Sequence, residues 1–266
     1  MALYLKRCRI DTLYKYCQIK NPDEFEKEYS VINLLENQIT FSTRSNFNDL
    51  FDSKIELIKP TKAEIKSTHS MLKGKYKQNF KQKYFGEHGK KYFDDLYHKI
   101  NKKFDEYLFL CLTVKPDSNL MWSHYASSHK GFCLEWDTSD IDAEKVKYQY
   151  DIASFELLDL IKIEYGLCDE GEIGNKIWSA FNVKLKEWEY ENEFRIQLGG
   201  GMEHLVSAKN SKFAIVSYKP CWIKSIIFGC RMEPKAIAYL DERLPSFIKR
   251  KYAVERKSKI MIESKR

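Results

Sequence analysis

The sequence lacks the short motifs that mark several common enzyme classes. It contains no G-x-S-x-G, no G-x-G-x-x-G and no G-x-x-x-x-G-K-[ST], which are the turns used by serine hydrolases, dinucleotide-binding folds and P-loop NTPases. It also has no zinc-finger or RNP pattern of a nucleic-acid-binding module. All of these classes are therefore disfavoured.

Paired cysteines and long apolar runs are missing as well. The seven cysteines are odd in number and form no C-x-x-C pair, and several, such as Cys111 in LFLCLTV, lie in apolar runs. This pattern disfavours a disulfide framework or zinc ribbon and fits reduced thiols. No stretch approaches the ~20 apolar residues of a membrane span, and the first residues lack the apolar core of a signal peptide. We therefore expect a cytoplasmic protein with no membrane partner.

What is present suffices for a folded core. The chain has 266 residues, of which 43% are hydrophobic and 14% aromatic, and a formal net charge of +7. This composition disfavours disorder. A mild positive excess suits an anionic partner, and solubility explains it equally well.

Hydrophobic periodicity predicts strands at both ends of the chain and helices between them. The expected strands are 12–16, 39–43, 107–114, 131–137, 145–150, 187–198, 213–218 and 223–229. The expected helices are 22–37, the 61–103 window with a break near Gly86 and Gly89, 121–126, 154–164, 174–186 and 234–244, before a basic tail. This order predicts an α+β fold around a central mixed sheet. We expect one domain over 1–266, with a Lys-rich helical insertion at about 61–106.

The 61–103 window carries the positive charge. It holds twelve Lys and four acidic residues, a net charge of +8, and Tyr76, Phe80 and Tyr84 recur at helical spacing. Lysines contact phosphates and aromatic rings stack on bases, which would suit RNA or DNA. A solvated helix pair with core aromatics explains the same pattern slightly better. The candidate nucleic-acid contacts are Lys73, Lys75, Lys77, Lys81 and Lys83.

The segment EWEYENEFRI (187–196) is dense in carboxylates. As a strand it would place Glu187, Glu189, Glu191, Glu193 and Arg195 on one face, with Trp188, Tyr190, Phe194 and Ile196 on the other. Such a row repels itself unless it faces water, a cation or a cationic transition state. The alternative is a solvated edge in which Arg195 pairs with Glu191 or Glu193.

Two further polar clusters are candidate ligand contacts. In FNDLFD (47–52), Asn48 and Asp49 would line a pocket or hydrogen-bond their own turn, and the turn is favoured for them alone. In MWSHYASSHKGFCLEWD (121–137), His124 and Tyr125 would be pocket residues, and a satisfied core histidine is an equal alternative for His124. The five-residue spacing of His124 and His129 is wrong for two metal ligands on one helical face.

The order and spacing of these motifs resemble a known bacterial family. LYKY (13–16), INLLENQITFS with FNDLFD, MWSHYASSHKGFCLEWD, EWEYENEFRI and IKSIIFG follow one another over about 10–230. This succession is similar to an uncharacterised bacterial family, the domain of unknown function numbered twenty-nine seventy-one. Leu50 stands where that family's pattern has Pro. The family implies no activity.

The opening strand, helix and strand also resemble the ADP-ribosyltransferases, including the DarT-type toxins that modify nucleic acid. In that superfamily a first-strand residue and a Ser-Thr-Ser-like second strand hold NAD, and a later strand supplies Glu-x-Glu. The matching positions here are Tyr14, Lys15 and Tyr16, then Ser42 and Thr43, then Glu191-Asn192-Glu193. The first-strand Arg or His of the superfamily is replaced by Tyr14-Lys15-Tyr16, and Arg44 replaces the second Ser.

This resemblance implies NAD-dependent ADP-ribosyl transfer and a role for each matched residue. Glu193 would hold the ribose 2′-hydroxyl as positive charge grows on the sugar, which favours the transition state over the ground state. Glu191 would orient or deprotonate the acceptor. Tyr14 or Tyr16 would stack on nicotinamide, Lys15 would meet a phosphate and Ser42 would support the ribose. By family analogy the chain would be a toxin or antiviral defence effector, with RNA or DNA as acceptor and a protein antitoxin as partner.

Two other functions remain open at this stage. One is a regulatory module without chemistry that binds nucleic acid through the 61–103 lysines. The other is a metal-dependent nuclease in which Asp49, Asp52, Glu191 and Glu193 hold Mg²⁺. We assign no metal ligand among the candidate site residues.

Overall fold

The computed structural model describes residues 10–264. Contacts divide the chain into two compact units. Unit 1 is formed by the described parts of Met1–Ser42, Leu108–Val146 and Glu187–Arg266, and unit 2 by Thr43–Tyr107 and Lys147–Lys186. The expected helical insertion at about 61–106 lies in unit 2, which also takes in the later segment.

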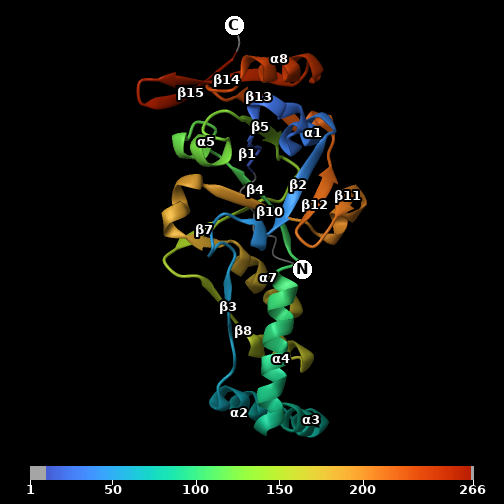
Figure 1. Ribbon diagram of the computed structural model, residues 1–266. Coiled ribbons are helices and arrows are strands. Elements are labelled where there is room, and N and C mark those ends of the chain that lie inside the picture. The colour runs from blue at the N-terminus through green and yellow to red at the C-terminus, as the bar shows by residue number, and fades with distance from the viewer. Residues whose placement is uncertain (1–9, 265–266) are drawn as a thin grey trace. The chain divides into compact units, whose positions relative to one another are not determined.

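A mixed β-sheet dominates unit 1 (Figure 1). Among the described residues it has 11 strands, with the path β11-β12-β2-β4-β1-β5-β13-β14-β15, while β10 pairs with β4 and β6. The strands β13 and β14 are parallel, whereas β1 is antiparallel to both β4 and β5. The bounds are β1 Thr12–Cys17, β2 Gln38–Thr43, β4 Leu108–Thr113, β5 Phe132–Asp137, β6 Glu144–Lys145, β10 Glu193–Gln197, β11 Val206–Lys209, β12 Phe213–Ser217, β13 Ile223–Phe228, β14 Lys249–Arg256 and β15 Lys259–Ser264.

One face of this sheet, the core face, is apolar. It carries Leu13, Leu112, Leu134, Trp136 and Phe194 in one buried cluster. The cluster includes residues of α1 (Tyr29–Leu35) and α8 (Pro234–Arg243). Alternation within each strand explains this arrangement, because every second side chain points to the same face. The expectation that Phe132, Leu134 and Trp136 share one face is confirmed.

The other face, the site face, is partly covered by α5 (Asn119–Tyr125). Met121 and Trp122 of this helix pack with Tyr16, Cys133 and Ile227 in a second buried cluster. The turn after α5 brings the backbone close to β1, because a Cβ on Gly131 would lie 2.0 Å from the carbonyl oxygen of Cys17. Only glycine fits that approach. The remaining short helices of unit 1 are η1 Pro22–Lys27, η3 Lys186–Glu191, η4 Gly200–Leu205 and η5 Pro220–Trp222.

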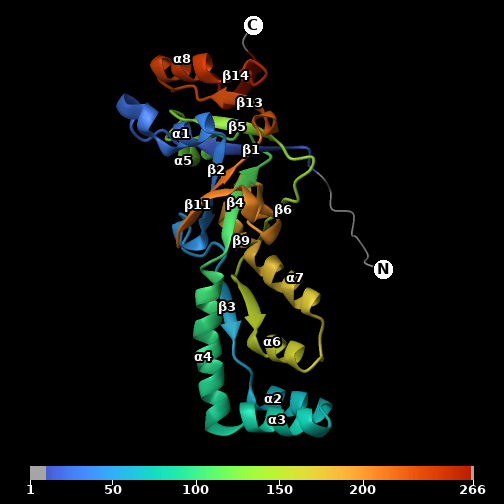
Figure 2. The same cartoon turned by 90° about the vertical axis from the view of Figure 1, so that its right-hand side faces the viewer.

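Unit 2 is mainly helical and contains two small parallel strand pairs. Figure 2 shows β3 and β8 side by side, and the other pair is β7 with β9. The bounds are η2 Arg44–Asn46, β3 Ile55–Ile58, α2 Lys62–Met71, α3 Gly74–Tyr84, α4 Gly86–Phe104, β7 Lys147–Gln149, β8 Ala153–Glu156, α6 Leu157–Glu164, α7 Glu170–Phe181 and β9 Val183–Leu185. The predicted helices in the Lys-rich window are thus confirmed. In the described part of the chain, no helix is both long and apolar enough to cross a bilayer.

Aromatic packing and one buried ion pair hold unit 2 together. Phe80 and Tyr84 of the predicted aromatic stripe are buried with ring centroids 4.7 Å apart, whereas Tyr76 is exposed. Lys184 and Asp52 form an ion pair at 3.2 Å, and each side chain is only 3% exposed. Two of the three residues of the stripe therefore belong to the core, as expected for a solvated helix pair with core aromatics.

Several predicted element boundaries were wrong because pairing partners and local backbone changes override periodicity. Residues 22–37 divide at Glu28, which is extended. Residues 153–156 pair with β3 before α6 begins, and α7 ends at Phe181 so that 183–185 can pair with β7. The predicted strand 145–150 is split between β6 and β7.

Two further corrections concern glycine and the C-terminal segment. The helix break falls at Gly86, whose φ is +68°, and not at Gly89. Gly89 lies inside α4, where a Cβ would come within 2.0 Å of the Tyr84 carbonyl oxygen. The predicted basic tail is instead the β14–β15 hairpin, whose described residues extend the sheet.

Replacing Lys184 should destabilise unit 2 strongly. Lys184→Met removes the cation that lies 3.2 Å from the buried Asp52 carboxylate, and breaking a buried pair by removing one member costs roughly 3–5 kcal/mol. The exposed pair between Lys59 and Asp94 provides a control, because Lys59→Met should change the free energy of unfolding by at most about 1 kcal/mol. Urea unfolding of the full chain measures the free energy of unfolding of both variants. Equal effects of the two substitutions would contradict this assignment.

Candidate active site

A row of polar side chains crosses the site face of unit 1. Tyr14 on β1 pairs with Thr113 on β4, and Thr113 pairs on its other side with Glu193 on β10. Tyr14 also pairs with Glu135 on β5, which in turn pairs with Ser225 on β13. Residues directly opposite each other in antiparallel strands point to the same face. The first strand and Glu193 therefore share one face, with β4 between them.

The backbone turns sharply between the two glutamates. Glu191 ends η3, Glu193 begins β10, and Asn192 between them has a φ of +46°. The predicted strand over 187–198 is therefore wrong in its first half, since a left-handed residue interrupts the extended backbone. Glu187 and Glu189 are exposed on η3 and do not form a single row with Glu193.

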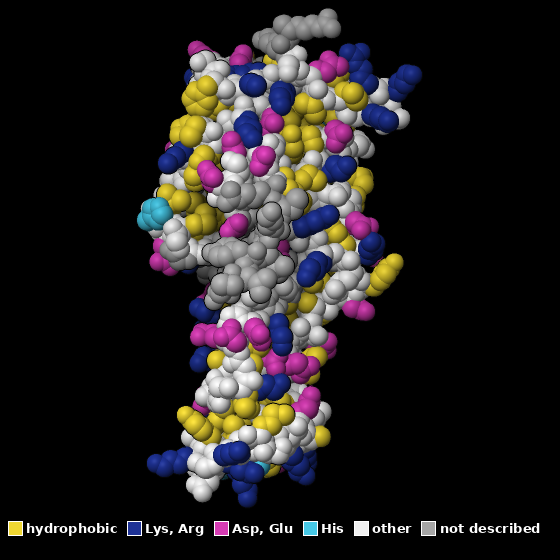
Figure 3. Space-filling model, turned by 180° about the vertical axis from the view of Figure 1, so that it is seen from behind, with side chains coloured by type: hydrophobic (Ala, Val, Ile, Leu, Met, Phe, Trp, Pro, Cys, Tyr) yellow, Lys and Arg dark blue, Asp and Glu magenta, His cyan; other side chains and the backbone are white. Residues whose placement is uncertain are grey.

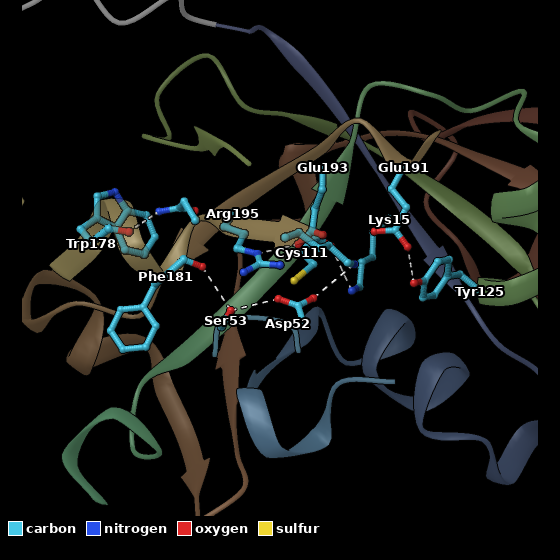
Figure 4. A network of polar contacts seen from close by, with 12 residues as sticks. Lys15, Asp52, Ser53, Cys111, Tyr125, Trp178, Phe181, Glu191, Glu193 and Arg195 are labelled. Carbon is cyan, nitrogen blue, oxygen red and sulfur yellow. Dashed lines mark hydrogen bonds and ion pairs between the residues drawn. The ribbon is translucent and has the colours of Figure 1, made fainter. Parts of the chain in front are cut away.

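Both carboxylates of this turn are buried and have partners (Figure 4). Nε of Arg195, whose side chain is fully buried, donates to Oε1 of Glu193 at 2.7 Å. The hydroxyl of Tyr125 on α5 donates to Oε1 of Glu191. Thr113 donates its hydroxyl proton to the backbone carbonyl of Glu191 at 2.5 Å. The pairing of Arg195 with Glu193, one of the expected alternatives, is present in a buried setting.

Tyr14 and Glu135 form the other end of the row. Burial, followed by the charge of Glu135, raises the pKa of Tyr14 to about 12. Burial alone would raise the pKa of Glu135, but hydrogen bonds from Lys251 and Ser225 lower it overall. The phenol of Tyr14 is therefore neutral and Glu135 is charged at neutral pH, so the row offers both a donor and an anion.

The other matched residues of the first two strands have different surroundings. Tyr16 is buried, its ring lies 5.1 Å from that of Trp122, and its hydroxyl donates to the Lys115 carbonyl at 2.6 Å. Lys15 follows the opposite alternation to Tyr14, and its Nζ donates to the Cys111 carbonyl at 3.1 Å. Ser42 is half-buried and, by alternation with Phe41, belongs to the site face. The structure thus brings Tyr14, Ser42 and Glu193 to one face and uses Tyr16 mainly in packing.

His124 is exposed, which contradicts its interpretation as a core histidine. Its ring lies 6.2 Å from that of Tyr190 and 6.3 Å from that of Tyr125. It therefore lies at the edge of the site, beside the tyrosine that holds Glu191.

Three predicted ligand contacts belong to unit 2. Thr43 is buried and its hydroxyl hydrogen-bonds that of Ser45 at 2.8 Å. Asp49 accepts a hydrogen bond from the Phe51 backbone N–H at 2.9 Å, which is the self-contained turn expected as the alternative. Asn48 is exposed beside it.

Four of the five candidate lysines are exposed. Lys73, Lys75, Lys77 and Lys81 lie on or beside α3, and Figure 3 shows basic side chains gathered at this end of unit 2. Lys83 differs, because it pairs with Glu164 at 2.8 Å and lies over the rings of Tyr84 and Tyr92. Lys83 therefore has a packing role within unit 2.

Sequence reasoning missed Thr113, Glu135 and Ser225. Glu135 had a signal, since it alternates with the apolar Leu134 and Trp136 and so had to lie on the opposite face. For Thr113, the only indication in the sequence was its position at the end of an apolar run. In the part of the chain that the structure describes, no group of three His, Cys, Asp or Glu side chains is arranged to hold a metal ion.

Comparison with known sequences bears on the segment that carries the glutamates. Residues 121–196 match a family described as a protein of unknown function, DUF2971. The DUF2971 match includes Tyr125, Glu191, Glu193 and Arg195, and it confirms the expected family resemblance over this segment of the wider 10–230 range. No curated protein and no solved structure matches the chain.

The lowered pKa of Glu135 predicts a pH-dependent contribution to stability. Because the folded-state pKa lies below the ordinary value of 4.5, the contribution is present above that value and is lost as the pH falls through the folded pKa. Glu135→Gln should therefore lower the free energy of unfolding by roughly 2 kcal/mol near neutral pH, as expected for hydrogen bonds to a charged group. The difference from the parent chain should shrink at acidic pH.

Urea unfolding at several pH values checks this prediction. Glu263→Gln is the matched control, because Glu263 pairs with Arg256 on the surface of unit 1 and both side chains are exposed. A pH-independent difference for Glu135→Gln would show that the carboxylate charge does not stabilise the fold.

Proposed function

We propose that the chain is a NAD-dependent ADP-ribosyltransferase whose active site is the Tyr14–Thr113–Glu193 row of unit 1. The observation that carries the proposal is the cross-strand register, which aligns the first strand and a buried glutamate on one face through Thr113. Ser42 belongs to the same face by alternation. A fold of the ADP-ribosyltransferase type is part of this proposal, and the α+β architecture with its mixed sheet is compatible with it.

The proposed reaction breaks one bond and forms another. The bond between the nicotinamide nitrogen and C1′ of the ribose breaks, and nicotinamide leaves with the bonding electron pair. The acceptor's oxygen or nitrogen atom then bonds to C1′ and gives up one proton. Positive charge grows on the ribose as the bond breaks, so a fixed carboxylate stabilises the transition state more than the ground state.

The surroundings of Glu193 suit this role. It is 4% exposed, and its neighbour Arg195 holds Oε1 at 2.7 Å. The guanidinium orients the carboxyl group, and a carboxylate oxygen accepts a hydrogen bond from a ribose 2′-hydroxyl. Low exposure strengthens the attraction between this carboxylate and a developing cation. We assign Glu193 to the ribose.

Glu191 is assigned to the acceptor. The hydroxyl of Tyr125 donates to one of its oxygen atoms, and the left-handed Asn192 turns it away from the extended line of β10. A carboxylate held in this way accepts the proton that the acceptor releases. Tyr14, whose pKa is raised to about 12, is neutral and offers an aromatic face for nicotinamide. NAD is then the substrate, and RNA or DNA the proposed acceptor.

Removing the carboxylate of Glu193 should abolish transfer. Glu193→Gln should lower the rate of label transfer from labelled NAD by at least about 100-fold, in the range seen when one electrostatic group is removed from an active site. Separate pools of RNA, DNA and protein identify the acceptor. Glu187→Gln, an exposed change of the same kind, is the control and should keep the parent rate. Full activity in Glu193→Gln would end the proposal.

A second variant separates lost chemistry from lost folding. Glu193→Gln removes the carboxylate charge that lies 2.7 Å from Nε of the buried Arg195, whereas Glu193→Gln with Arg195→Met removes both members of this pair, which is often neutral for stability. The double variant should fold and show no transfer. Circular dichroism establishes the fold before the assay.

The exposed lysines of α3 should contribute to acceptor binding if that acceptor is a nucleic acid. Replacing four of them with Gln should weaken binding and reduce the slope of log affinity against log salt by about 3. The substituted residues are Lys73, Lys75, Lys77 and Lys81. Fluorescence anisotropy with a labelled RNA or DNA measures the slope.

The control for this experiment replaces four exposed lysines of unit 1. These are Lys20, Lys130, Lys209 and Lys257. This control variant has the same net charge, so it should leave most of the salt dependence intact. Equal slopes for the two variants would show that α3 is not the contact surface.

A further inference from the structure

A cavity opens on the core face of unit 1, on the side of the sheet opposite the Glu193 row. Its volume is about 560 Å³, and its wall includes Phe41, Leu112, Ile196 and Val216 from four different strands. Cavities of roughly 300–1,000 Å³ with mainly apolar walls are typical of small-molecule sites. The size and lining therefore fit a compact organic molecule.

Two polar side chains in this wall have unused hydrogen-bonding atoms. Trp136 and Tyr218 are 3% and 7% exposed, and both line the cavity. Among residues 10–264, neither Nε1 of Trp136 nor the hydroxyl of Tyr218 has a hydrogen-bond partner. Their rings meet edge to face, with centroids 4.7 Å apart. Buried donors without partners are rare in folded proteins because each costs free energy.

The chemistry of the two groups restricts the ligand. The indole N–H is only a donor, and burial raises the pKa of Tyr218, which keeps its hydroxyl protonated. Both groups can therefore donate a hydrogen bond to an acceptor atom on the ligand. Asp137, Asp140 and Asp142 also line the cavity, and its described lining contains no Lys or Arg. This excess of acidic residues disfavours ligands that carry carboxylate or phosphate groups, including NAD itself.

We propose that this cavity binds an uncharged, mainly apolar small molecule whose carbonyl or similar oxygen accepts hydrogen bonds from Trp136 Nε1 and the Tyr218 hydroxyl. The apolar part of the molecule lies against Phe41, Leu112 and Ile196. The two polar atoms are themselves closed to water, so binding includes a small shift of these side chains. This site is separate from the proposed transferase site, because the two lie on opposite faces of the sheet.

Titration of the full chain with Nile red, a neutral dye that carries a carbonyl acceptor, tests the proposal. The dye should bind saturably at one site, and dodecanamide should displace it whereas dodecanoate, of the same chain length but charged, should not. Trp136→Phe and Tyr218→Phe should each weaken binding by about three- to tenfold, the effect of one neutral hydrogen bond. Trp188→Phe and Tyr150→Phe, outside the cavity lining, are the matched controls.

Several outcomes would overturn the proposal. One is the absence of saturable binding, a second is equal displacement by dodecanoate, and a third is an affinity that neither donor substitution changes. The unfolding midpoint of Tyr218→Phe without dye gives an independent check, because removing a hydroxyl that has no partner should not lower it. A lowered midpoint would show that a water molecule or another part of the chain already satisfies the hydroxyl, and that the cavity needs no ligand oxygen.

Discussion

Thr113 on β4 connects the three segments on which the candidate active site depends. Its Cα pairs with Tyr14 on one side and with Glu193 on the other, and its hydroxyl holds the carbonyl of Glu191 at 2.5 Å. A slip of one residue would turn Thr113 to the apolar face and break this alignment. The buried leucines at 108, 110 and 112 prevent the slip, because they belong to the core face in this register only. The geometry of the polar row therefore depends on the hydrophobic pattern beside it.

The same alternation separates two chemically different surfaces. The site face carries the buried carboxylates of Glu191 and Glu193 and the charged Glu135, and it suits a substrate that develops positive charge. The core face carries the apolar cavity with the unpartnered donors of Trp136 and Tyr218, and it suits an uncharged molecule with an acceptor oxygen. Trp136 and Glu135 are neighbours in sequence, so one strand, β5, contributes to both faces.

Periodicity predicted the elements whose pattern is local and long. The strands β1, β2, β4, β5 and β13 and the helices of the Lys-rich window follow from alternation or helical spacing in the sequence. The segment 187–191 resembled a strand because its residues alternate, but Asn192 adopts a left-handed conformation that ends this pattern. Residues 249–264 resembled a basic tail because of their many charged residues, but they form a β-hairpin that is stabilised by pairing with β13.

The candidate site was only partly predictable for a related reason. Glu191, Glu193 and Tyr125 were identifiable from their side-chain chemistry, and the Glu193–Arg195 pair was one of two alternatives for Arg195. The partnership of Thr113 with Tyr14 joins residues about a hundred positions apart, and the pairing of Trp136 with Tyr218 likewise joins distant segments. Such contacts depend on the order of strands in the sheet, which periodicity does not specify. The sequence indicated the groups, and the fold determines which of them meet.

A crystal structure of the chain with a carbocyclic NAD analogue, whose nicotinamide bond cannot be cleaved, tests the central claim most directly. The account predicts that the analogue lies on the face that carries Tyr14, Thr113 and Glu193. A carboxylate oxygen of Glu193 should then lie within hydrogen-bonding distance of the 2′-hydroxyl. An analogue bound away from this face, or no bound analogue at saturating concentration, would contradict it.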